Sequence, residues 1–192
     1  MKGVAQRVCT FALIAVMLSA CAAPPLKLYT LTPVPESSDP SPLPRNATII
    51  VVDRVYLPDY LDTQDLIIRR GNVLDRSQTG RWASRLSVSA TDLLTAKLAM
   101  RRPDALVTDG VRTAVPDYEI TVDVSRLDVS SAGQGVMDAD WQIIPRADTK
   151  HIVRDRVRIT LEGSVASDKG IVGLESRLFE RLAASIDISG LR

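Results

Sequence analysis

The stretch EITVDVSRLDVSSAGQGVMDADWQII, residues 119–144, alternates apolar and polar residues in the manner of two half-buried β-strands. The apolar positions change phase once, between Val124 and Leu127, which predicts a β-bulge near Ser125–Arg126. The segment SAGQG at 131–135 predicts the turn, and Trp141 falls on the apolar face of the second strand. The stretch therefore predicts a β-hairpin that has one face in a hydrophobic core.

The flanking segments extend this sheet and supply helices. Alternation between Val153 and Val165 predicts a third long strand. Apolar residues at helical spacing predict amphipathic helices over Trp82–Arg102 and Ile171–Ile188. Shorter strands are expected at Leu26–Leu31, Ile49–Val52 and Leu66–Arg70. We therefore expect an α+β fold, in which an antiparallel or mixed sheet carries two amphipathic helices packed on one face.

The N-terminus has the features of a secretory signal peptide, because a short basic segment precedes an apolar run, Val8 to Leu18, and then small residues. This run is shorter than the about 20 residues that a membrane-spanning helix needs. Residues 18–21, LSAC, resemble the bacterial lipobox, in which the cysteine is lipidated and the chain is cut before it. The alternative is an ordinary signal peptide with a chance cysteine. We expect a signal peptide at 1–20, a lipidated Cys21 with a short tether at 21–26, and a single domain at 27–192.

Removal of the signal peptide would change both the charge and the thiol content of the chain. The mature chain would carry 22 basic and 23 acidic side chains, so its charge gives no reason to expect binding to nucleic acid. Cys9 would leave with the signal peptide, so no second thiol would remain to pair with Cys21. Ala22, rather than aspartate, follows the cysteine, which favours the outer membrane by the sorting rule of such lipoproteins.

The sequence offers few groups for catalysis, and we expect no catalytic residues, no cofactor and no metal site. Asp138 and Asp140 would share one face of a strand at a spacing that inverting glycosidases use. The next strand, however, places arginines at 154, 156 and 158 on the same outer face, which favours structural ion pairs. The only histidine, His151, is expected in a solvated hairpin loop.

Large apolar side chains occur in predicted loops beside prolines and charged residues, in the segments VYLPDYLDTQDLIIRR (55–70) and GRWASRL (80–86). Such side chains either cover one end of the sheet or form a binding surface, and the sequence leaves both readings open. The candidate partner-binding residues are Leu57, Pro58, Tyr60, Leu61 and Trp82, with Tyr56 beside them.

Four motifs carry a resemblance to a known family. They are YTL at 29–31, LPDYLDTQDLIIRR at 57–70, RWASRL at 81–86 and ADWQI at 139–143. Together, and in this order after Cys21, they resemble the ABC-type transport auxiliary lipoprotein family, which is the family of paraquat-inducible protein C (PqiC). The resemblance covers nearly the whole mature chain.

The resemblance implies a non-enzymatic lipoprotein on the periplasmic face of the outer membrane. Its implied partner is an MCE-family periplasmic protein and, through it, an inner-membrane transporter that moves phospholipids and supports outer-membrane integrity. An outer-membrane assembly lipoprotein similar to LptE is the first alternative, and a lipid-anchored envelope hydrolase is the second. The sequence leaves homo-oligomerisation, the transported lipid and the direction of transport open.

Overall fold

The computed structural model describes residues 25–31, 42–110, 115–147 and 151–191. The predicted signal peptide and Cys21 lie outside these described residues. The elements in chain order are β1 Lys27–Tyr29, β2 Ile49–Val52, β3 Asp65–Arg70, β4 Val73–Trp82, α2 Leu86–Arg101, β5 Leu106–Thr108, β6 Tyr118–Val129, β7 Gln134–Pro145, β8 Val153–Glu162 and α3 Asp168–Ser185.

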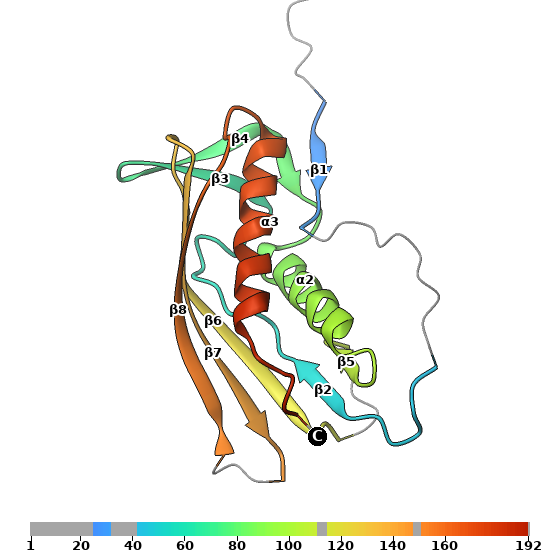
Figure 1. Cartoon of the computed structure of the whole chain (residues 1–192). Helices are drawn as coiled ribbons and strands as arrows, with labels where there is room; N and C mark the ends of the chain where they lie inside the picture. Colours follow the sequence, from blue (N-terminus) through green and yellow to red (C-terminus); the bar gives the residue numbers. More distant parts are fainter. Residues whose placement is uncertain (1–24, 32–41, 111–114, 148–150, 192) are drawn as a thin grey trace, which may run out of the picture.

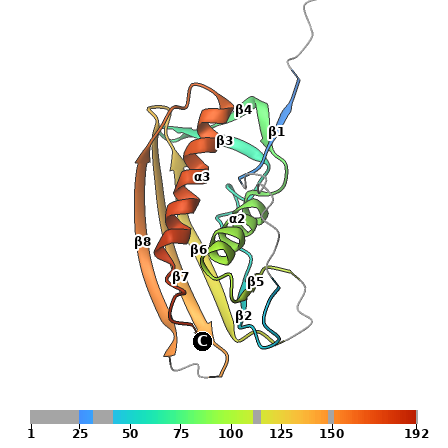
Figure 2. The ribbon, with the colours of Figure 1, turned by 45° about the vertical axis from the view of Figure 1, so that its right-hand side comes forward.

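A mixed five-stranded sheet with the strand order β5-β2-β6-β7-β8 forms the larger part of the fold (Figure 1). Strand β2 is parallel to both β5 and β6, whereas β6, β7 and β8 are antiparallel neighbours. Both helices lie on the same side of this sheet, as Figures 1 and 2 show, with α3 packed on β6–β8 and α2 packed on β2 and β5. The predicted α+β class and the placement of both helices on one face are confirmed.

The predicted central hairpin is present, with the bulge where the change of phase placed it. The register of β6 against β7 shifts between Val124 and Arg126. Val122 lies opposite Trp141, and both side chains are buried on the helix side of the sheet. The turn between the strands contains Gly133, whose φ of 88° lies in the region that glycine adopts without strain. A Cβ at this position would also lie 2.4 Å from the Gly163 carbonyl oxygen, so the turn requires glycine.

A second, three-stranded sheet with the order β1-β4-β3 was not predicted. Strand β1 is parallel to β4 and lies at the edge of this sheet, as its flanking prolines predict. Strands β3 and β4 form an antiparallel hairpin. The predicted strand at Leu66–Arg70 corresponds to β3, but β4 is an additional strand.

The first helix starts four residues later than predicted, at Leu86 instead of Trp82. Trp82 is the last residue of β4, and its N–H donates to the Gln64 carbonyl at 2.7 Å. The next N–H, of Ala83, donates to the Tyr29 carbonyl at 2.8 Å. Because these two N–H groups are held by the small sheet, the chain turns into the helix only after them.

The last helix, α3, is capped at its N-terminus by Ser167, whose hydroxyl accepts a hydrogen bond from the Gly170 N–H. The buried stripe of α3 includes Leu174, Leu178 and Leu182, and these residues have no solvent exposure. Leu178 and Leu182 face a core to which both helices and both sheets contribute, whereas Leu174 packs with Val129 and Ile171 in a second, smaller cluster. Each such leucine contributes about 1.5–3 kcal/mol to folding through burial.

Candidate partner-binding surfaces

The loop over residues 53–64 connects β2 to β3 and runs along the edge of β6. Tyr56 exchanges two backbone hydrogen bonds with β6, at 2.9 and 3.0 Å. Beside it, the Val55 N–H donates to the Thr91 hydroxyl of α2 at 2.9 Å, and the Val55 side chain is buried. Because β6 and α2 both hold the backbone at this point, the loop presents its exposed side chains in a defined position.

Asp62 of this loop supplies the N-terminal cap that α2 lacks in its own sequence. The residue before the helix, Arg85, makes no side-chain cap, whereas an Asp62 carboxylate oxygen accepts a hydrogen bond from the Ser87 N–H at 3.2 Å. Burial opposes ionisation of Asp62, but its hydrogen bonds to Ser87 and Arg85 outweigh this effect and lower its pKa. The carboxylate therefore stays charged at a helix end that favours negative charge.

Three of the five candidate partner-binding residues belong to the core. Leu57, Leu61 and Trp82 are only 4%, 5% and 1% exposed, so they cover the end of the sheet and offer no surface to a partner. Tyr60 is 41% exposed, and Pro58 is partly exposed. The neighbouring Tyr56 is the most open of the large side chains here, at 64%. The packing reading is correct for the three core residues, and a docking role for this loop stays a prediction that depends on the two tyrosines and Pro58.

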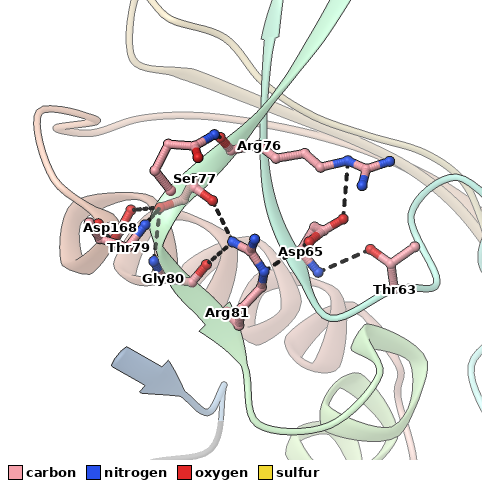
Figure 3. A network of polar contacts seen from close by, with 9 residues as sticks. Thr63, Asp65, Arg76, Ser77, Thr79, Gly80, Arg81 and Asp168 are labelled. Carbon is pink, nitrogen blue, oxygen red and sulfur yellow. Dashed lines mark hydrogen bonds and ion pairs between the residues drawn. The ribbon is translucent and has the colours of Figure 1, made fainter. Parts of the chain in front are cut away.

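The charged residues of the family-like motifs hold the small sheet together (Figure 3). Asp65 of β3 accepts from two arginines of β4, with Arg81 Nε at 3.0 Å and Arg76 Nε at 3.1 Å. The Asp65 N–H also donates to the Thr63 hydroxyl at 3.1 Å. Asp65 therefore connects β3 to β4 where their register is irregular.

A second carboxylate, Asp168 in the first turn of α3, joins the helix to β4 (Figure 3). The hydroxyls of Ser77 and Thr79 each donate to one of its oxygens at 2.7 Å. A Cβ at Gly80 would lie 2.7 Å from the same carboxylate and 2.7 Å from the Leu66 side chain, so a larger residue here would displace both side chains. These contacts give the polar strand β4 its place in the fold, and they assign Asp168 a structural role.

A shallow groove of about 730 Å³ lies on the opposite side of the large sheet from the helices. Tyr56 borders it, polar residues of β6 and β7 line it, and the arginines of β8 close it. The residues of this outer face within the groove are Tyr56, Thr121, Asp123, Asp140, Gln142, Arg154 and Arg156. Since both helices pack on the other face, this groove is open to a partner.

Ion pairs cross the outer face between β7 and β8, as predicted. Arg156 makes two hydrogen bonds to Asp140, at 2.6 and 2.8 Å, and Arg158 makes two to Asp138, at 2.5 and 3.0 Å. These bonds lower the pKa of both carboxyls. A general acid of a glycosidase needs a raised pKa, so the pair has the opposite protonation behaviour.

The outer face continues toward the exposed tyrosines of the loop. Arg69 of β3 makes a 2.5 Å ion pair with Asp128 of β6, which also accepts from Arg126 at 2.7 Å. The pKa of Arg69 is raised mainly by its hydrogen bond to Asp128 and to a smaller extent by Tyr60. Tyr60 therefore lies close to Arg69, and the loop meets the outer face at Tyr56, which borders the groove.

Three further features concern a catalytic histidine, a metal site and a membrane-spanning helix. His151 lies exposed just before β8, at the loop end where it was predicted. Among the described residues, no cluster of three or more histidine, cysteine, aspartate or glutamate side chains is arranged to hold a metal ion. Neither described helix is long and apolar enough to cross a membrane.

Comparison with solved structures shows that the fold is shared. A crystal structure of an uncharacterized protein matches with a TM-score of 0.65 at 17% identity, over 83% of this chain and 95% of the other. Protein XCC0632 from Xanthomonas campestris matches with a TM-score of 0.59 at 13% identity, over 82% and 90% of the two chains. No curated protein sequence matches the chain significantly.

A family model covers most of the chain. The model of the ABC-type transport auxiliary lipoprotein component matches residues 29–187, which run from the last residue of β1 to just beyond α3. This range contains the large sheet, the small sheet except for the first two residues of β1, both helices and the loop at 53–64. The match confirms the resemblance that the sequence motifs indicated, and the chain belongs to the family of ABC-type transport auxiliary lipoprotein components.

Proposed function

We propose that this protein is a non-enzymatic lipoprotein, anchored through Cys21 on the periplasmic face of the outer membrane, that docks a periplasmic MCE-family protein. Through that partner it would serve an inner-membrane ABC transporter that moves phospholipids. The observation that carries the proposal is the family match over residues 29–187 behind an N-terminal sequence with the features of a lipoprotein signal.

The arrangement of charged groups supports a binding role over an enzymatic one. Asp138 and Asp140 are held by arginines that keep both carboxylates ionised. Asp65 and Asp168 fix the small sheet and α3. These four carboxylates of the described part of the chain therefore form ion pairs or hydrogen bonds that hold the structure together.

The outer face is the surface best suited to the partner. Exposed Tyr56 borders the groove, which neither helix covers, and exposed Tyr60 lies close to Arg69. Across this face the arginines of β8 pair with the aspartates of β7. Interfaces draw much of their binding energy from tyrosine and arginine at such positions. The complementary surface of the partner would carry both acidic and basic side chains, together with an apolar contact for the two tyrosines.

The test replaces Tyr56 and Tyr60 together by serine and measures binding of the purified variant to the MCE protein of the same organism. Loss of two hot-spot residues should weaken binding by about 30-fold or more, which corresponds to about 2 kcal/mol. Thermal melting should barely change, because both side chains are exposed. Met100→Ser is the matched control, since Met100 is 77% exposed at the end of α2.

The melting and binding results together decide whether the tyrosines dock the partner. Normal melting with full binding of the double variant rules out the tyrosines as the docking surface. If the unaltered protein binds no MCE protein, the proposed partner is wrong. Leu61→Ser should lower the melting temperature strongly, because Leu61 is buried, and it therefore separates loss of fold from loss of docking.

A further inference from the structure

The start of β1 exposes apolar side chains on a strand edge. Leu26 is 55% exposed and Leu28 is 65% exposed, although Leu31, three residues later, is only 2% exposed. Strand β1 pairs with β4 on one side, and no other described strand pairs with it. Proteins seldom leave an apolar strand edge open, because it invites association. We therefore expect these two leucines to contact an apolar surface outside the described chain.

The length of the chain before β1 identifies that neighbour. Leu26 follows Cys21 by five residues, so the chain between them spans at most about 18 Å. The headgroup layer on each side of a bilayer is about 6 Å thick. A lipid on Cys21 would thus keep the two leucines within a short distance of the hydrocarbon boundary, whichever way the tether runs.

The shape of the molecule allows this contact. In both views β1 enters from one end of the molecule, beyond the N-terminal turn of α3, and the C-terminus lies at the other end (Figures 1 and 2). Lys27, between the two leucines, is exposed and can reach lipid phosphates with its long side chain. An apolar pair next to a lysine suits the boundary between headgroups and acyl chains.

We propose that the start of β1 rests in the headgroup layer of the anchoring membrane, with Leu26 and Leu28 in contact with lipid. This inference rests on the lipidation of Cys21 that is part of the proposed function. It gives the domain a fixed orientation, in which the β1 end faces the membrane and the end with the C-terminus points away from it. The occupant of this apolar edge is a lipid surface, not a protein.

The test uses the thiol content of the mature chain. Its only cysteine is Cys21, whose sulfur is blocked when it carries the lipid, so Leu28→Cys introduces a single reactive thiol. The full lipidated variant is labelled there with the environment-sensitive dye NBD and reconstituted into phosphatidylethanolamine–phosphatidylglycerol vesicles. We expect blue-shifted emission and strong quenching by lipids that carry a nitroxide in the headgroup region. The matched control, Met100→Cys, should show neither effect.

The outcomes separate the two proposals. Vesicle flotation and the mass of the N-terminal peptide report lipidation, and a chain that lacks the lipid overturns both. In a chain that carries the lipid, an NBD signal at position 28 that matches the one at position 100 overturns the membrane contact alone. Blue-shifted emission without quenching by lipid nitroxides also overturns it, because a protein then covers the leucines.

Discussion

Glu175 of α3 should make the stability of this protein fall as the pH rises through the neutral range. The residue is only 4% exposed, and one of its carboxyl oxygens, Oε2, is buried with no hydrogen-bond partner. It borders a small cavity of about 10 Å³, which is at most enough for one water molecule. Burial raises the pKa of Glu175 to about 8, so the side chain is buried as the neutral acid.

The charged groups that face Glu175 offer it no free cation. Asp65 and Arg69 of β3 and Asp128 of β6 line the same cavity. Arg69 is paired with Asp128, and Asp65 is paired with the arginines of β4. Ionisation of Glu175 would therefore place an unpaired negative charge in the core.

The sign and the size of the effect follow from this pKa. The unfolded chain releases the Glu175 proton near pH 4.5, whereas the folded chain keeps it up to about pH 8. Between these values the folded state binds more protons than the unfolded state, so stability falls by about 1.4 kcal/mol per pH unit. From pH 5 to pH 8 the loss is about 4 kcal/mol, a large part of the 5–15 kcal/mol that typically holds a domain folded.

Glu175→Gln removes the titration and keeps the shape of the side chain. Urea unfolding at pH 5, 6, 7 and 8 should show falling stability for the unaltered protein and a nearly flat profile for the variant. Glu180→Gln on the same helix is the control. Glu180 is ion-paired with Lys97 at the surface, so this variant should keep the slope of the unaltered protein. Parallel profiles for Glu175→Gln and the unaltered protein would refute the reasoning, since Glu175 would then not be the group that titrates.

Three further substitutions test the sheet, and a fourth, on α3, serves as a control. Trp141→Ala should cost about 3–5 kcal/mol in urea unfolding, because Trp141 is 5% exposed on the helix side of the sheet, and a fully stable variant would contradict its packing. Asp140→Ala should leave the melting temperature nearly unchanged, since its ion pair is exposed, and a large drop would show that the pair is structurally essential. Gly133→Ala should destabilise by about 1–3 kcal/mol because of its positive φ, whereas Gly173→Ala, in open space on α3, should be neutral or stabilising; equal effects of the two would refute the strain at Gly133.

The long strands and the last helix could be predicted because they follow the periodicity of buried side chains. The alternation on β6 and β7 even located the bulge between Val124 and Arg126. Strand β4 has no such alternation, since most of its side chains are polar and only Gly80 and Trp82 are buried. Its place in the fold comes from contacts between residues far apart in the sequence, such as Ser77 with Asp168, which a local pattern does not contain.

The candidate surface was only partly predictable for the same reason. Tyr60 and Leu61 are neighbours in an irregular loop, yet one is 41% exposed and the other 5%. No period in the sequence separates them, because their exposure depends on the unpredicted small sheet that closes this end of the core. The outer-face ion pairs could be predicted, since the alternation along β7 and β8 places Arg156 opposite Asp140 and does not depend on the conformation of the loops.

The most direct test of the proposed function is a pull-down from detergent-solubilised outer membranes with an affinity-tagged MCE protein as bait, in cells that produce this protein with either Cys21 or Cys21→Ser. We predict that the unaltered protein is found in the outer-membrane fraction and co-purifies with the bait. The serine variant should instead move to the soluble periplasmic fraction, because the lipid is its expected anchor. An unaltered protein that is recovered from the outer membrane without the MCE protein, or a serine variant that stays in that membrane after a high-salt wash, would contradict the account.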